Sequence, residues 1–341
     1  MEIMVHSSYI RRKDMDSVLN SLVTDRLGPG EYVDKFLKVA KERLSFDFGV
    51  AVRSPMVALD LACTCLGLVS GDQIGLSALS PKWAGKVLLS RGLVPVWLDV
   101  EMSSAALSSA SFDRLKSNPV KAIYIAHPWG IVIDPSIVSE LGVPLIEDAT
   151  STIGARIGDV KAGMIGALTI LGMEHAGSIT SGGGALLFAA GRRESMTLRN
   201  ASEVLVNEER MSDMNAALAL SQIKDLDKFL EKRRELAELY AQSLARSHRK
   251  FLSPTVDCEP SNFGCVVVLD SGVKDVRAYA KKKDVDTVLA FEDTCTYAGF
   301  VPEGSCPVAA SLTNRSVAFP LNQRISKSAA QKIAKVLATL P

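Results

Sequence analysis

Histidine and cysteine are sparse in this 341-residue sequence, and their placement excludes two common kinds of site. The four histidines have no spacing typical of metal ligands, so no metal site is predicted. The six cysteines form no CxxC pair, which indicates reduced, packed thiols rather than a disulfide framework. An excess of one charge is missing as well, since 39 Lys and Arg stand against 38 Asp and Glu. Net charge therefore favours neither nucleic acid nor a membrane surface as a partner.

Long hydrophobic runs are also missing. Residues 162–190 are the most apolar region, but Glu174, His175 and many glycines interrupt it, so no membrane span is predicted. Near the N-terminus, Arg11, Arg12 and Lys13 precede a polar stretch instead of the apolar core of a signal peptide. We therefore expect a cytoplasmic protein whose ligand is small or polar.

Short apolar runs alternate with helical periodicities through the first half of the sequence. After the turn Gly28-Pro29-Gly30, apolar residues recur at helical spacing from Glu31 to about Ser45. Strands are then predicted at Gly49–Val52, Gln73–Ala78, Val94–Leu98, Ala122–Ala126 and Pro144–Glu147, and helices at Met56–Leu66, Trp83–Arg91 and Pro135–Glu140. This alternation predicts an α/β fold with a mostly parallel sheet covered by helices on both faces.

The second half of the sequence predicts a change of architecture. Two strands, Ala167–Leu171 and Ala185–Phe188, enclose a glycine-rich loop, and a helical pattern runs from Met211 to about Ala245. After Ser253-Pro254 we predict strands Cys265–Leu269 and Ser316–Phe319 and helices Val273–Lys282 and Ser326–Leu340, the last with Ser326 as N-cap. The predicted large domain is 1–225, with an N-terminal segment 1–30. Residues 226–341 are predicted to form a long connecting helix and a small α+β domain.

A series of short motifs identifies a resemblance. In chain order they are Leu27 to Val33 (LGPGEYV), His127 to Gly130 (HPWG), Ile146 to Ala149 (IEDA), Arg210 to Leu218 (RMSDMNAAL), Cys306 to Ala309 (CPVA) and Phe319 to Leu321 (FPL). They resemble, in the same order and over nearly the whole chain, the DegT/DnrJ/StrS family of sugar aminotransferases. That family uses pyridoxal phosphate (PLP), so the resemblance implies the three-layer fold-type I PLP-transferase architecture and a PLP site.

The resemblance gives the ring end of that site three candidate cofactor contacts, Asp148, Trp83 and Ser151. Asp148 matches the acidic partner of the pyridine nitrogen, at the end of a predicted parallel strand where open α/β sheets bind ligands. Trp83 is the candidate for the group that stacks on the ring. Ser151 and Ile153 stand where the family has glutamine and histidine, so two polar contacts are absent from this chain.

The phosphate end departs further from the family. A Ser-Gly-Thr run there donates backbone amides and a hydroxyl at a helix N-terminus, whereas this chain has Ser54-Pro55-Met56. The candidate cofactor contacts at this end are Ser54 and Met56. Proline has no N–H and methionine has no hydroxyl, so Ser54 and the helix-end amides remain as donors. A family asparagine that reaches the phosphate across a dimer interface corresponds to Glu208, a carboxylate.

The Schiff-base lysine is absent. The family carries it in the loop before a glycine-rich run, and here residues 173–178 (MEHAGS) precede Gly182-Gly183-Gly184. No lysine occurs between Lys161 and Lys224, so no shift of the alignment within this loop supplies one. His175 lies within about two residues of the lysine position, and imidazole is suited to proton transfer near neutral pH.

Two functions follow from the resemblance. In the first, the chain has lost lysine-dependent transamination and is a sugar-nucleotide binder, or a partner subunit of an active homologue, within a homodimer or a heterodimer. In the second, it is a PLP-dependent sugar-nucleotide dehydratase-type enzyme with His175 in place of the lysine, as in one branch of the family. In both, PLP is held without a covalent bond if it binds, and the first also allows no cofactor.

Overall fold

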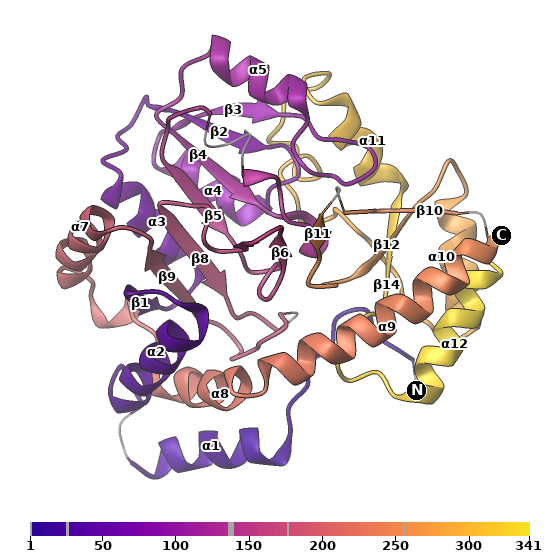
Figure 1. The fold of residues 1–341 in the computed structure, drawn as a ribbon, viewed down its shortest axis with the longest axis horizontal. Helices are drawn as coiled ribbons and strands as arrows, with labels where there is room; N and C mark the ends of the chain where they lie inside the picture. The colour runs from indigo at the N-terminus through magenta and orange to yellow at the C-terminus, as the bar shows by residue number, and fades with distance from the viewer. Residues whose placement is uncertain (1, 25–26, 136–139, 176, 248, 255–256) are drawn as a thin grey trace.

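A sheet of seven strands organises the first two thirds of the computed structural model, which describes residues 2–24, 27–135, 140–175, 177–247, 249–254 and 257–341 (Figure 1). The strands lie in the order β1-β9-β8-β5-β4-β2-β3. In chain order they are β1 (Phe48–Val52), β2 (Gln73–Ser77), β3 (Val94–Leu98), β4 (Ala122–Ala126), β5 (Leu145–Asp148), β8 (Leu168–Gly172) and β9 (Ala185–Ala189). Five of them, β8, β5, β4, β2 and β3, pair in parallel, so their carboxyl ends share one edge.

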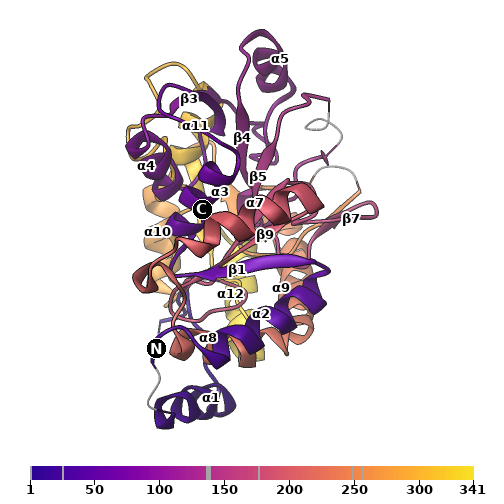
Figure 2. The ribbon, with the colours of Figure 1, turned by 90° about the vertical axis from the view of Figure 1, so that its left-hand side faces the viewer.

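Helices cover both faces of this sheet, which gives three layers (Figures 1 and 2). Alternate residues of a strand point to opposite faces, so Ile170 and Leu187 pack in one core and Leu171 and Phe188 in another. The first core also contains residues of α3 (Pro55–Cys65) and α4 (Lys82–Ser90), with α7 (Arg192–Glu203) alongside α3. Helices α2 (Glu31–Leu44) and α8 (Asp213–Ile223) cover the other face, and α5 (Ser109–Ser117) packs on it over β3 and β4.

A second, antiparallel sheet occupies the C-terminal third. Its strands, in spatial order, are β10 (Lys250–Phe251), β12 (Cys265–Val268), β14 (Ser316–Phe319) and β13 (Val288–Leu289). Its core is shared with α9 (Leu226–Ser247), α10 (Val273–Lys282) and α12 (Lys327–Ala338), and α11 (Pro307–Arg315) leads into β14. A small sheet of β11 (Cys258–Glu259), β6 (Arg156–Ile157) and β7 (Val160–Lys161) links the two regions.

Sequence and structure agree on most strands and differ at particular elements. The predicted helix from Met211 to Ala245 is wrong, because α8 ends at Ile223 and α9 begins at Leu226. The buried Asp225 in this break pairs with Arg11, Lys13 and Lys228, so a charge cluster terminates one helix and starts the next. Strands β1 and β9 run antiparallel to their neighbours, an arrangement that apolar periodicity does not encode.

Several smaller features complete the comparison with the sequence. Ser326 accepts a hydrogen bond from the Ala329 N–H and caps α12, as predicted. Helix α1 (Arg12–Val23), in the N-terminal segment, was not predicted, nor were α5, α7 and α11. The predicted helix Pro135–Glu140 falls mostly outside the described residues. Within the described part of the chain, no helix combines the length and apolarity that a bilayer crossing requires.

Candidate functional site

A cavity of about 470 Å³, which we call the cleft, opens at the carboxyl ends of β4 and β5. Its walls come from the N-terminal segment, the first turns of α3 and α4, the turns after β4 and β5, the loop after β8 and residues 288–294. Side chains that matter for its chemistry are His6, Pro55, Trp83, Trp129, Asp148 and Glu174. Parallel sheets bind ligands at this edge because strand-end loops converge there.

Asp148 is the buried carboxylate of the cleft, with 4% of its surface exposed. Its Oδ2 accepts a 2.8 Å hydrogen bond from the Tyr124 hydroxyl, and its Oδ1 accepts a 3.0 Å bond from the Thr150 N–H. Burial raises the pKa of Asp148, and these donors only partly offset the effect. A cationic ring nitrogen beside this carboxylate would lower that pKa and be favoured by it, so Asp148 suits the role that the resemblance implies.

Glu147, the preceding residue, faces away from the cleft and anchors the strand end. Its carboxylate accepts hydrogen bonds from His127 Nε2 at 2.8 Å and from the backbone N–H groups of Gly163, Ile165 and Gly166. Burial raises the pKa of Glu147, but the four donors outweigh it and the net shift is downward. His127 Nδ1 accepts from the Ile133 N–H, so its proton sits on Nε2, toward Glu147. The pair fixes the turn that follows β4.

Two tryptophans form aromatic walls of the cleft. Trp83, at the start of α4, meets the Tyr124 ring edge-on with centroids 6.2 Å apart, which places it close to Asp148. Trp129 has a left-handed backbone (φ 49°), and its indole N–H donates to the Ala290 carbonyl at 3.1 Å. A Cβ at Gly264 would lie 2.2 Å from the Trp129 ring, so only glycine fits beside it. The predicted stacking residue, Trp83, thus lies next to the predicted carboxylate.

The phosphate end of the cleft offers few donors. Ser54 Oγ is the N-cap of α3 and accepts from the Val57 N–H at 3.4 Å, which leaves its O–H free to donate, but Ser54 is not among the residues that line the cleft. Pro55 lines the cleft, and a Cβ on Gly172 would lie 2.9 Å from its ring. Met56 is 38% exposed and does not line the cleft, although it was predicted as a cofactor contact. Glu208 is exposed on the surface and is not among the cleft residues.

Ser151 and Ile153 follow Asp148 but have different surroundings. Ser151 lines the cleft and donates a 2.6 Å hydrogen bond to the His127 carbonyl, which ties together the turns after β4 and β5. Ile153 is buried on the other face of the sheet, with α2 and α8. Of the two substituted family positions, only Ser151 can therefore reach a ligand in the cleft.

The loop after β8, where the resemblance places the family's lysine, directs Glu174, rather than His175, into the cleft. His175 is exposed, its carbonyl accepts from the Ser8 hydroxyl at 3.0 Å, and its ring lies edge-on to His6 with centroids 6.3 Å apart. Further along, the Ser178 carbonyl accepts from Gln323 Nε2 at 3.2 Å. The loop is thus pinned at both sides, with its histidine at the mouth of the cleft.

His6 is a cleft residue that the sequence did not reveal. Its ring stacks on Trp129 with centroids 6.3 Å apart and an interplanar angle of 18°. Burial lowers the pKa of His6, and the neighbouring His175 lowers it further, so its neutral form is favoured. No motif surrounds His6, and only the fold brings the N-terminal segment to a strand end more than a hundred residues away.

Lys82 is the second such residue and the one lysine among the described residues that line the cleft. Its ammonium pairs with Asp293 Oδ1 at 2.6 Å, and both side chains are largely exposed at the rim. The hydrogen bond to Asp293 raises the pKa of Lys82. A lysine becomes nucleophilic when its pKa falls. The raised pKa of Lys82 instead keeps its amine protonated, as a cation.

PLP, the cofactor that the resemblance implies, fits the cleft at one end. Asp148 and Trp83 suit the pyridine ring, and a cavity of about 470 Å³ is in the range of small-molecule sites. At the phosphate end the donors within one chain are reduced to the Ser54 hydroxyl and the helix-end amides, because Pro55 has no N–H. The residues of the cleft are therefore better suited to hold the pyridine ring of PLP than to hold its phosphate.

Comparison with known proteins supplies the family. The profile of the DegT/DnrJ/EryC1/StrS aminotransferase family matches residues 8–338. GDP-perosamine synthase of Vibrio cholerae is 25% identical over 313 residues, which cover 87% of this chain and 84% of that protein. L-glutamine:2-deoxy-scyllo-inosose aminotransferase of Micromonospora echinospora is 31% identical over 219 residues, covering 56% and 51% respectively.

Solved structures match over the full length. The aminotransferase TlmJ from Streptoalloteichus hindustanus superposes with a TM-score of 0.89 at 22% identity, covering 98% of both chains. The PLP form of the putative sugar aminotransferase Spr1654 from Streptococcus pneumoniae gives 0.91 at 15% identity, covering 99% of this chain and 98% of that one. These likenesses confirm the predicted fold-type I architecture. From Ser8 to Ala338, this chain belongs to the DegT/DnrJ/EryC1/StrS aminotransferase family.

Proposed function

We propose that this protein binds a sugar nucleotide, with or without PLP held non-covalently, in the cleft, and that it does not catalyse lysine-dependent transamination. The observation that carries the proposal is the absence of a nucleophilic lysine at this site. The segment between Lys161 and Lys224 contains none, and Lys82, on a different wall, is a cation paired with Asp293. Sugar chemistry enters because the relatives include GDP-perosamine synthase, and because the structurally similar Spr1654 is named a putative sugar aminotransferase.

PLP would supply an electron sink for a substrate amine, and the residues of this chain would only position it. Asp148 would face the ring nitrogen and Trp83 the ring, while Ser151 and Tyr124 hold the loops around them. Without a lysine there is no internal amine to hold the cofactor between turnovers. The protein is then suited to binding, or to pairing with a subunit that has the lysine.

Borohydride reduction tests this proposal, because it fixes a covalent lysine adduct of PLP irreversibly. The purified protein is incubated with PLP, reduced and measured by intact mass and peptide mapping. We expect the cleft peptides to keep their unmodified mass, and Lys82→Met to give the same result as the parent. A stoichiometric adduct at Lys82 that disappears in Lys82→Met would refute the proposal.

Equilibrium dialysis with PLP and, separately, with a nucleotide sugar measures non-covalent binding. Trp83→Ala and Asp148→Asn should weaken any PLP complex, since they remove the ring contact and the charge partner. Trp97→Phe, a buried tryptophan on β3 that is absent from the cleft lining, is the matched control. If the nucleotide sugar does not bind, the proposed substrate class is wrong. The borohydride test for a covalent lysine adduct is independent of that result.

A second candidate function uses histidine as the base in a dehydratase-type reaction on a sugar nucleotide. The observation that favours it is the edge-on pair of His6 and His175, with His6 inside the cleft and Glu174 beside it. His6, whose pKa is lowered, is neutral and can accept a proton near neutral pH. Turnover that survives in both His175→Ala and His6→Ala would exclude this candidate.

A further inference from the structure

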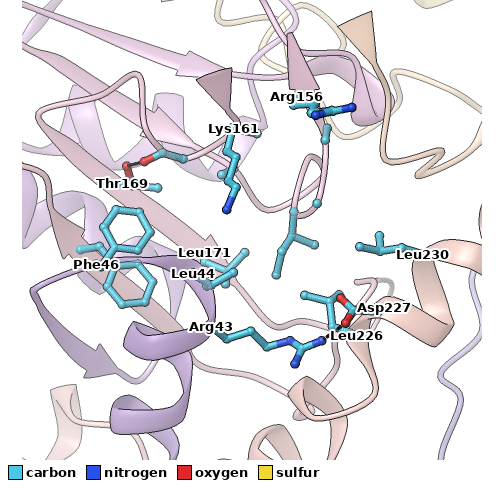
Figure 3. Close-up of a pocket in the computed structure, with 17 residues that line it drawn as sticks. Arg43, Leu44, Phe46, Arg156, Lys161, Thr169, Leu171, Leu226, Asp227 and Leu230 are labelled. Carbon is cyan, nitrogen blue, oxygen red and sulfur yellow. Dashed lines mark hydrogen bonds and ion pairs between the residues drawn. The ribbon is translucent and has the colours of Figure 1, made fainter. Parts of the chain in front are cut away.

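Figure 3 shows a second cavity, of about 410 Å³. It shares the segment after β5 with the cleft but is lined by different residues of that segment. It is bounded by the end of α2, the β6–β7 hairpin, the side of β8 and β9 that carries Leu171 and Phe188, and the first turn of α9. Ala149 and Ile153 line this cavity, whereas Thr150 and Ser151 between them line the cleft. One short segment therefore separates two cavities, and only the cleft belongs to the site described above.

The floor of the second cavity is apolar and rigid. The rings of Phe46 and Phe188 stack with centroids 4.2 Å apart and an interplanar angle of 2°. Leu171 from β8 and Leu230 from α9 complete the wall. Gly154 is required there, because its φ is +84° and a Cβ would lie 2.2 Å from Leu230 Cδ1. An apolar body of a small molecule would be desolvated against this floor.

The charged groups around the cavity do not balance. Arg43 pairs with the exposed Asp227 at 2.5 Å, and Arg156 pairs with Glu259 outside the cavity. The ammonium of the exposed Lys161 has no acidic or hydrogen-bonding partner among the described residues, and in Figure 3 it points into the cavity. Arg43 Nε, on the facing wall, is buried without a hydrogen-bond acceptor. A buried donor without an acceptor is costly, so it marks a place for a ligand oxygen.

We propose that this cavity binds a small amphipathic monoanion, with its carboxylate between Lys161 and Arg43 and its apolar body on the Phe46–Phe188 floor. One negative head group would neutralise the unpaired lysine and give Arg43 Nε its missing acceptor. The volume suits a single compact molecule rather than a peptide or a nucleotide chain. The inference does not rest on the function proposed for the cleft.

Phenylacetate and its uncharged analogue phenylacetamide are the probes, since they share a body and differ in the head group. Binding is titrated by ligand-observed NMR on the full chain. We expect phenylacetate to bind more tightly than phenylacetamide, and Lys161→Met to weaken phenylacetate by roughly threefold to fivefold. Lys274→Met, which removes an exposed lysine of α10 that has no charged partner among the described residues, should change nothing. Equal binding of both probes, or no binding of phenylacetate, overturns the proposal.

Ala162→Phe supplies a second test by filling the cavity. Ala162 is half-buried and lines it, so the added ring should abolish phenylacetate binding while thermal unfolding confirms that the variant folds. Unchanged binding to Ala162→Phe or to Lys161→Met places the probe elsewhere, for instance in the cleft, and overturns the assignment. A change of oligomeric state in Ala162→Phe, measured by sedimentation, would show that a second copy covers the cavity and would also overturn it.

Discussion

The Tyr124 hydroxyl donates a 2.8 Å hydrogen bond to Asp148 Oδ2 across the adjacent parallel strands β4 and β5. Both groups are buried, and burial raises the pKa of each, that of Tyr124 well above its ordinary value. The tyrosine therefore stays protonated and remains a donor at every physiological pH. The Tyr124 hydroxyl thus holds the Asp148 carboxylate in place in the cleft.

Removing that donor should destabilise the fold and raise the pKa of Asp148 further. We expect Tyr124→Phe to lower the free energy of unfolding by about 1–3 kcal/mol, because a buried carboxylate loses one of its two donors. Urea unfolding near neutral pH measures the change. Tyr297→Phe, at a tyrosine that is 54% exposed, is the control and should have little effect. A Tyr124→Phe variant as stable as the parent would mean that the hydrogen bond contributes nothing net.

Glu147 and Asp148, adjacent in sequence, should have opposite pH dependences. The folded-state pKa of Glu147 lies below 4.5, so its stabilising contribution is full above pH 4.5 and is lost as pH falls through the lowered value. The folded-state pKa of Asp148 lies above 3.8, so the fold favours its protonated form. That contribution is full below pH 3.8 and is lost as pH rises through the raised value.

Urea unfolding of Glu147→Gln and Asp148→Asn across this pH range measures whether the contribution of each carboxyl group to stability rises or falls with pH. The stability deficit of Glu147→Gln relative to the parent should shrink as pH falls below 4.5. The stability of Asp148→Asn relative to the parent should improve as pH rises above 3.8. Parallel curves for both variants and the parent would show that neither pKa is shifted by folding.

Much of the fold can be predicted from the sequence because each central strand is a short apolar run between turn residues. Ala122–Ala126 is an example, and its structure agrees with the prediction residue for residue. The break between α8 and α9 has no such local signal, since neither glycine nor proline marks it. It depends on Asp225 meeting Arg11 and Lys13 of the N-terminal segment, a contact between residues some two hundred positions apart.

The residues of the candidate site also divide into those that the sequence predicts and those that only the structure reveals. Asp148 and Trp83 are predictable through motif resemblance, and the fold brings both to one edge of the sheet. His6 and the Lys82–Asp293 pair are not, because their roles depend on which loops meet at that edge. The absence of lysine between Lys161 and Lys224 can be read directly from the sequence. That Lys82, from another wall, lines the same cleft can be seen only in the structure.

Gln323 should anchor the loop that follows β8, because it binds the backbone of that loop at Ser178. Its Oε1 accepts from Arg233 Nε at 3.2 Å and its Nε2 donates to the Ser178 carbonyl at 3.2 Å. Arg233 is 1% exposed, no acidic side chain pairs with it among the described residues, and burial lowers its pKa to about 10. Gln323→Leu removes the partner of Arg233 Nε and of the Ser178 carbonyl, while Arg233 keeps its bonds to backbone carbonyls through Nη1, so we expect a loss of about 1–3 kcal/mol in unfolding free energy.

Gln331→Leu, at an exposed glutamine of α12, is the matched control for that loss. Hydrogen exchange should also show faster exchange in residues 177–181 of Gln323→Leu, because the loop loses its anchor. If exchange there is unchanged, the bridge does not restrain the loop, whatever the stability loss.

A dimer should form across the loop that precedes α8. Val204 and Val206 are 80% and 56% exposed, and the Glu209 carbonyl accepts from the Arg53 N–H, which places their loop beside the exposed Met56 at the start of α3. Exposed apolar side chains gathered at one place are typical of an interface. In sedimentation velocity we expect a dimer for the parent and a monomer for the double variant Val204→Glu, Val206→Glu. Val69→Glu, at an exposed valine elsewhere, should leave the dimer intact.

Asp293 should control whether the cleft can make a covalent bond at all. Its carboxylate holds Lys82 as a cation and raises the pKa of that lysine, so Asp293→Asn lowers the pKa and increases the share of free amine. The gain is limited because both groups are largely exposed, so we expect only a minor, sub-stoichiometric borohydride-fixed PLP adduct at Lys82 in Asp293→Asn, where the parent gives none. Lys82→Met, Asp293→Asn is the control that removes the amine. If Asp293→Asn also gives no adduct, the Lys82 amine does not reach bound PLP, and the described walls of the cleft then supply no usable amine.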